Sequence, residues 1–281
     1  MITSDTMIAG APAPVKSESS VASVRRMLKN ALMISVRDSV LLNLASVNLL
    51  LQVFYIGLFL GGFFLYPALM GHPCRTQEEF NAFYNQQEHK AILLAVALTI
   101  QFFGTFISNF LLLTLDSEII RVWNGQKAEF KRGWRTAASH FWSLATWSLL
   151  ITPFNFMWVA SMCIVIPVLT RDKTVNPFKT LWRSVLLLLK IWKEFLLGIV
   201  GMMVILYWLF CLVFGSNTIF TFISRQCPPL IAWILLSIGI IFSLLALCFC
   251  YLFCNCYLCG QYIKASEGVE PSPENAFGDP A

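Results

Sequence analysis

Residues 195–215 read FLLGIVGMMVILYWLFCLVFG, an apolar run without Asp, Glu, Lys or Arg. A helix needs about 20 such residues to cross the ~30 Å hydrocarbon core of a bilayer. A strand of a membrane barrel would instead alternate between apolar and polar residues over about 10 positions. The run therefore predicts a transmembrane α-helix.

Similar stretches recur along the chain, which has 281 residues, 57% of them hydrophobic and 12% charged. The charge-free stretches are 39–74, 91–115, 136–170, 195–224 and 226–263. A soluble domain carries about 25% charged residues, so the excess apolar surface of this chain must face lipid. The sequence predicts an all-α, polytopic integral membrane protein.

The Lys and Arg residues predict how the chain is threaded, because such residues are retained on the cytoplasmic side of a membrane. Most of the 20 lie before the first stretch, after the second or after the third: Lys16, Arg25, Arg26, Lys29, Arg37, Arg121, Lys127, Lys131, Arg132, Arg135, Arg171, Lys173, Lys179, Arg183, Lys190 and Lys193. The two segments expected outside hold only Arg75, Lys90 and Arg225. This distribution predicts four full spans, with both termini cytoplasmic. The spans are expected at about 41–66, 91–115, 195–215 and 230–254.

The third stretch, 136–170, has basic residues beyond both ends and Thr152-Pro153-Phe154-Asn155 at its middle. As one helix it would extend about 52 Å, too long for one comfortable span. It is also too short for two spans of about 20 residues each. We expect a Pro-centred helical hairpin over 137–170, which brings the membrane helices to six. One long kinked helix is the alternative.

Both ends of the chain are polar. Residues 1–23 are rich in Ala, Pro, Ser and Thr and lack the apolar core of a cleavable signal peptide. They predict a disordered tail. The helical membrane domain is expected over 24–263, and residues 264–281 are expected to form a cytoplasmic tail.

Two basic amphipathic segments are expected to lie on the membrane surface as interfacial helices. Their predicted anchors are Arg25, Arg26, Lys29, Lys179, Trp182 and Arg183. The second segment begins with Asn176-Pro177, an N-cap followed by Pro at the first helical position. Membrane lipids are therefore the expected partners, together with a second copy or other membrane proteins. The net charge of +5 needs no nucleic acid to explain it.

The polar residues inside the predicted membrane helices are uncharged amides: Asn48, Gln52, Gln101, Asn109 and Asn155. Ion-driven pumps usually place charged side chains near the membrane centre, which argues against a pump. The amides either hydrogen-bond between helices, worth ~0.6 kcal/mol on average, or line a polar path through the membrane.

The nine cysteines divide by location. Cys74 and Cys227 fall in the two predicted exoplasmic segments, where an oxidising compartment would allow a disulfide; two free thiols are the alternative. The end of the last span carries a cluster of five: Cys248, Cys250, Cys254, Cys256 and Cys259. Helical spacing points these to opposite sides, so we expect apolar packing rather than a metal site.

Catalytic motifs are missing from the sequence, which has no P-loop, paired-glycine or His-Glu-x-x-His pattern. Asp116, Glu118 and His140 are the candidates that a lipid-modifying enzyme would have to bring together. The sequence therefore predicts a protein that is not an enzyme and has no cofactor.

Three patches, taken together, resemble a family of bacterial integral membrane proteins known only as a domain of unknown function. The patches are Gly133-Trp134-Arg135, then Pro167-Val168-Leu169 with Trp182-Arg183-Ser184 and Trp192, and finally Gln261-Tyr262 with Gly268. A looser similarity exists to the membrane domains found beside glycerophosphodiester phosphodiesterases. The resemblance implies six helices in a bacterial inner membrane and no catalytic residue.

Three functions stay open on these features. The missing catalytic motif favours a non-catalytic multi-pass protein, a scaffold or a component of membrane and envelope homeostasis. A passive permease or transporter subunit is the second hypothesis, and a lipid-modifying membrane enzyme is the third.

Overall fold

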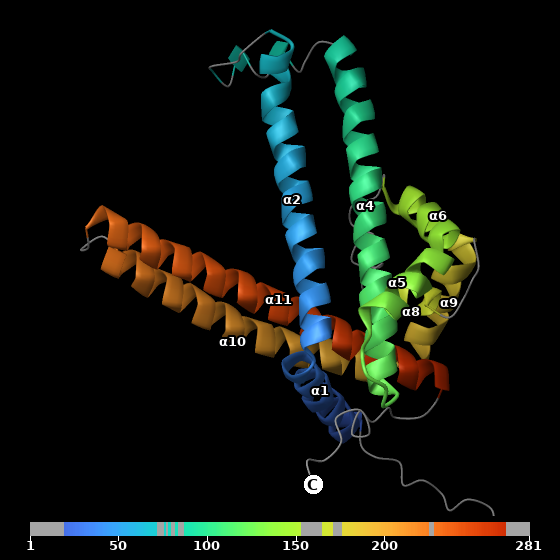
Figure 1. Ribbon diagram of the computed structural model, residues 1–281. Helices are drawn as coiled ribbons and strands as arrows, with labels where there is room; N and C mark the ends of the chain where they lie inside the picture. The colour runs from blue at the N-terminus through green and yellow to red at the C-terminus, as the bar shows by residue number, and fades with distance from the viewer. Residues whose placement is uncertain are drawn as a thin grey trace, which may run out of the picture.

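The computed structural model describes residues 20–71, 76, 78–79, 82–83, 87–152, 165–170, 176–224 and 228–267 (Figure 1). These residues form helices and no strand: α1 (Ser20–Arg37), α2 (Ser39–Leu69), α4 (Gln87–Trp123), α5 (Phe130–Ser139), α6 (Phe141–Ile151), α8 (Ile166–Leu169), α9 (Pro177–Lys190), α10 (Trp192–Ser224) and α11 (Pro229–Glu267). The prediction of an all-α fold is confirmed.

Three of these helices are long and apolar enough to cross a membrane: α4 over Lys90–Trp123, α10 over Trp192–Ile223 and α11 over Pro229–Ser266. A fourth is added if α1 and α2 are counted as one broken span, because the pair is bent by 86° at the residue between them. The chain therefore has the three to four membrane-length helices of an integral membrane protein.

The long helices pair into two hairpins that leave a common base in different directions (Figure 1). α2 packs along α4 in the first hairpin, and α10 packs along α11 in the second. The protein covers little of their apolar surface, since only 6% of the most apolar window of α11 is buried. Lipid has to cover the rest, because so large an apolar surface is unfavourable in water.

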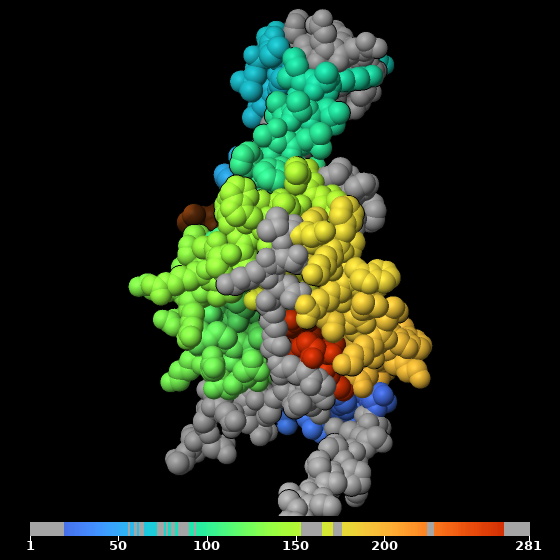
Figure 2. Space-filling view, turned by 90° about the vertical axis from the view of Figure 1, so that its right-hand side faces the viewer, coloured from blue at the N-terminus to red at the C-terminus, as the bar shows by residue number. Residues whose placement is uncertain are grey.

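The base contains the hydrophobic core. Residues 111–120 of α4 and 255–263 of α11 are buried on every side. α1 and the adjoining ends of α2 and α10 surround the α11 segment, while α5, α6 and α8 pack on α4. Figure 2 shows the α2–α4 hairpin as a narrow stalk above this wider base, with α5 and α6 in yellow-green and α9 in yellow.

Local sequence signals set several helix ends. Asp38 caps α2, because its Oδ1 accepts hydrogen bonds from the backbone N–H groups of Val40 at 2.9 Å and Leu41 at 3.1 Å. Asn176 caps α9 in the same way, as its sequence predicted. α4 ends at Trp123 and the chain turns at Gly125, whose φ of 75° favours glycine.

The segment predicted as a hairpin returns to one place on α4. Ile151 at the end of α6 and Ile166 at the start of α8 belong to the same buried cluster as Leu112 and Leu113 of α4. At 11 residues, α6 is too short to cross a bilayer alone. The predicted midpoint at Pro153 lies outside the described residues.

Two predicted boundaries differ from the observed helices. α1 begins at Ser20, inside the range predicted as a disordered tail. α11 continues to Glu267 and so includes the first residues of the predicted C-terminal tail. Its last turns are buried in the base because α1 and α10 pack against them.

Close helix approach in the base depends on glycine. A Cβ at Gly198 of α10 would overlap the phenol ring of Tyr257 on α11. A Cβ at Gly260 of α11 would lie 2.9 Å from the Trp123 ring of α4. These glycines let α10 and α4 pack directly against the buried end of α11.

We expect Gly198→Ala to destabilise the protein by about 1–3 kcal/mol, since overpacking a tight contact forces neighbouring groups to move. The measurement is the free energy of unfolding in detergent or bicelles. Gly215→Ala on the same helix is the control, because no described atom lies within 4 Å of that Cβ position. The control should leave stability unchanged or raise it by up to about 1 kcal/mol. Equal behaviour of the two variants would contradict the packing of α10 on Tyr257.

Candidate functional site

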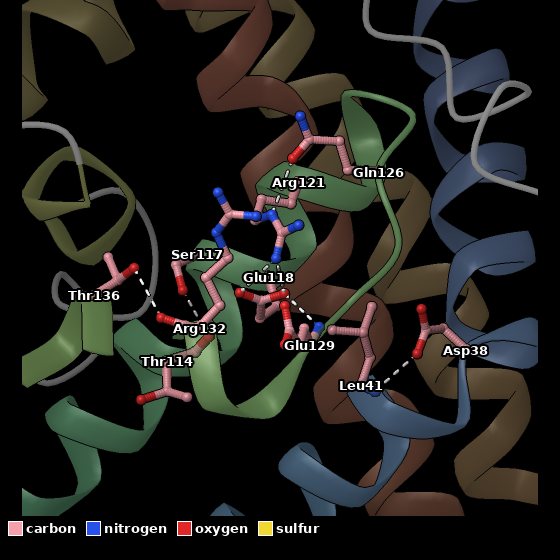
Figure 3. A network of polar contacts seen from close by, with 10 residues as sticks. All are labelled: Asp38, Leu41, Thr114, Ser117, Glu118, Arg121, Gln126, Glu129, Arg132 and Thr136. Atoms are coloured by element: carbon pink, nitrogen blue, oxygen red, sulfur yellow. Dashed lines mark hydrogen bonds and ion pairs between the residues drawn. The ribbon is translucent and has the colours of Figure 1, made fainter. Parts of the chain in front are cut away.

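The junction between α4 and α5 holds a network of charged and polar groups around Glu118 (Figure 3). The Glu118 carboxylate accepts a hydrogen bond from the backbone N–H of Glu129 at 2.7 Å. It also pairs with the Arg121 guanidinium at 3.0 Å. Arg121 Nε donates in turn to Gln126 Oε1 at 3.0 Å. Glu118 thus ties the loop between the two helices to the end of α4.

At the same junction, α5 packs closely against α4. A Cβ at Gly133 would lie 2.9 Å from both Glu118 Cγ and the carbonyl oxygen of Thr114. A larger residue there would push α5 away. With Gly133 facing inward, the charged residues of α5 face outward.

A pocket of about 280 Å³ opens on this outward side, lined by Glu129, Lys131, Arg132 and Arg135. All four residues are exposed. Lysine and arginine side chains of this kind bind phosphate and carboxylate groups. The pocket is therefore a candidate site for an anion.

A buried carboxyl group, Asp116, lies two residues before Glu118 in α4. It is 1% exposed, and neither of its oxygens accepts an N–H or O–H hydrogen bond from the described residues. The thiol of Cys259 on α11 is its polar neighbour. The described residues of the base enclose Asp116, so a substrate cannot reach its carboxyl group past them.

Two of the predicted polar residues connect three helices. Asn48 of α2 donates to the Tyr251 hydroxyl of α11 at 2.6 Å. Gln52 of α2 donates to Ser108 Oγ of α4 at 3.1 Å and lies 3.4 Å from Asn48 Oδ1. The structure therefore brings Asn48 and Gln52 into one interhelical cluster.

The other polar residues attach α6 to α4. Asn109 Nδ2 donates to Ser148 Oγ at 3.0 Å, and Gln101 Nε2 donates to the carbonyl oxygen of Thr152 at 2.7 Å. Asn155 lies outside the described residues. The four described amides thus belong to helix contacts at two separate places.

The predicted surface anchors lie on the exposed sides of two helices. Their positions are Arg25, Arg26 and Lys29 on α1, and Lys179, Trp182 and Arg183 on α9. Trp182 is 65% exposed. The opposite side of α1 packs into the base through Met27, Ala31 and Ile34.

Sequence reasoning missed a charged clasp at the end of α11. Lys264 Nζ donates to Glu194 of α10 at 2.5 Å and to Ser23 of α1 at 2.6 Å. Lys190 of α9 donates to the carbonyl oxygen of Ala265 at 3.0 Å. No local signal marks this clasp, because its partners are far apart in the chain.

No metal centre is found among the described residues, since no group of three His, Cys, Asp or Glu side chains converges there. Cys248, Cys256 and Cys259 are buried as free thiols, and Cys250 and Cys254 are half-buried. His140 is buried and contacts the carbonyl oxygen of Thr136 through Nδ1 at 2.8 Å. The predicted pair Cys74 and Cys227 lies outside the described residues.

No family model, curated protein or solved structure matches the chain. The resemblance to a bacterial membrane protein family therefore stays a prediction. The sequence patches that carry it contribute Gly133, Val168, Ser184 and Tyr262 to the buried parts of the base.

We expect Glu118→Gln to loosen the junction, because it removes the charge that accepts from Arg121 and from the Glu129 backbone. Hydrogen bonds to charged groups contribute about 1.5–3 kcal/mol, so stability should fall by about that amount. Hydrogen–deuterium exchange in residues 124–135 should also become faster. Glu129→Gln is the matched control, since it retains the backbone N–H donor. Slow exchange in Glu118→Gln would show that the contact does not hold the loop.

Proposed function

We propose that this chain is a non-catalytic, multi-pass scaffold of the bacterial inner membrane, with a helical base at the cytoplasmic face. Four full spans and the hairpin over 137–170 would supply six membrane helices. The observation that carries the proposal is the division of surfaces. The hairpins expose apolar side chains to lipid, whereas polar side chains at the base join separate helices, as Lys264 of α11 joins Glu194 of α10 and Ser23 of α1.

The use of the polar groups supports a scaffold over an enzyme. Glu118 is engaged by Arg121 and the Glu129 backbone, and Asp116 is enclosed in the core. His140 contacts Ser139 and the carbonyl oxygen of Thr136, both in the last turn of α5. An enzyme acting on lipid would need such groups to converge on a surface that its substrate can reach.

The same reasoning weighs against a permease. Gln101 and Asn109 both donate hydrogen bonds to α6 or to the residue that ends it. A polar path that used the Nε2 donor of Gln101 and the Nδ2 donor of Asn109 would have to break these contacts with α6 and Thr152. An amide in a membrane helix is stabilised by such contacts by ~0.6 kcal/mol on average.

A flux assay separates the scaffold from the permease. In sealed proteoliposomes containing the purified chain, we expect solute and ion permeability equal to that of protein-free vesicles. Radiolabelled phospholipid in the same vesicles should stay chemically unchanged. Saturable flux that disappears in Gln101→Leu/Asn109→Leu would favour the permease. Lipid turnover that disappears in Asp116→Asn would favour the enzyme.

A further inference from the structure

The pocket on α5 has three cationic side chains that the scaffold does not use. Lys131, Arg132 and Arg135 are exposed. Their side chains form no ion pair or hydrogen bond with any residue that the structure describes. Arg121, in contrast, is held by Glu118. These three cations and the Glu129 carboxylate give the pocket lining a formal charge of about +2 at neutral pH.

Exposed aromatic side chains lie beside this pocket on α5 and at the start of α6. Phe130 is 51% exposed and Trp134 is 46% exposed. Phe141 and Trp142 continue the strip. Trp134 also packs edge-on against Phe110 of α4 with ring centroids 4.7 Å apart, which fixes its position. Exposed tryptophans of membrane proteins gather at the level of the lipid headgroups.

We propose that this pocket binds the phosphodiester headgroup of an anionic phospholipid. A guanidinium group can donate two parallel hydrogen bonds to phosphate oxygens, and Lys131 adds a compact positive charge. Glu129 can accept a hydrogen bond from a hydroxyl of a glycerol headgroup. This inference rests on the proposed placement of the base at the membrane surface, where basic pockets recognise such headgroups.

Contacts within the protein fix the position of the pocket without a bound lipid. Glu118 holds the backbone of Glu129, and Gly133 lets α5 lie directly on α4. The cations therefore project from a helix whose first residue and whose packing against α4 are both fixed. A site ordered in advance loses less entropy on binding.

The test compares binding of phosphatidylglycerol and phosphatidylcholine to the purified full chain by native mass spectrometry. We expect the wild-type chain to prefer phosphatidylglycerol by about tenfold or more, as expected for charge-assisted contacts. In K131Q/R132Q/R135Q this preference should fall by about tenfold. R37Q/K127Q/K193Q removes three exposed charges that lie outside both the pocket and the predicted anchors, and it should change the preference by less than about threefold.

Three outcomes would overturn the proposal. Equal losses in the two triple variants would show diffuse attraction to a basic protein. An unchanged preference in K131Q/R132Q/R135Q would place the lipid elsewhere. Displacement of the lipid by millimolar inorganic phosphate would indicate a site for a free anion.

R132K/R135K retains both charges and should still lose part of the preference, because lysine cannot form the forked contact.

These results are independent of the flux assay. Saturable flux with an intact lipid preference would overturn the scaffold and leave the headgroup site standing. Absent flux with equal losses in the two triple variants would overturn the headgroup site and leave the scaffold standing.

Discussion

Residues 255–263 of α11 are covered by protein on every side, and the arrangement of the base depends on this burial. Trp123 of α4 donates from Nε1 to the carbonyl oxygen of Cys256 at 2.9 Å, and its ring rests on Gly260. Gly198 brings α10 onto Tyr257. The two hairpins are joined through this segment, because α2, α4 and α10 all pack against α11. A bulky or charged replacement there would act on both hairpins together.

The two ends of each long helix differ in what they contact. At the base, hydrogen bonds and ion pairs connect separate helices, as in the clasp of Lys264 with Glu194. Along the hairpins, apolar side chains such as Trp208 and Trp233 remain exposed. Lipid tails solvate such surfaces without a hydrophobic penalty, so helices in a bilayer need small residues or polar contacts to associate. The cluster of Asn48, Tyr251, Gln52 and Ser108 supplies polar contacts close to the base.

The features that depend on neighbouring residues could be predicted from the sequence. Charge-free stretches such as 195–224 mark long helices, and Asn176-Pro177 marks the start of α9. The burial of the end of α11 could not be predicted, because Asn255, Tyr257 and Gln261 resemble residues at a membrane surface. Asn255 and Gln261 hydrogen-bond within α11, and the helices α1, α4 and α10 pack against α11. Tertiary contacts of this kind leave no periodic signal in one sequence.

The candidate site was only partly predictable for the same reason. The cations of α5 are visible as a basic segment, and Glu118 is visible as a charge after the second stretch. The pairing of Glu118 with the backbone of Glu129 depends on the turn at Gly125. The pocket also depends on the close packing of Gly133 against α4. Only the three-dimensional arrangement of α5 and α4 shows this contact.

The central proposal is that both hairpins cross the bilayer from a base at its cytoplasmic face. Labelling of intact cells or oriented vesicles with an impermeant thiol reagent tests it most directly. Variants should retain Cys74 alone, Cys227 alone or an introduced S266C at the base, each after reduction. The account predicts that Cys74 and Cys227 react from outside, whereas S266C reacts only after the membrane is opened. Reaction of Cys74 and Cys227 from opposite sides would contradict it.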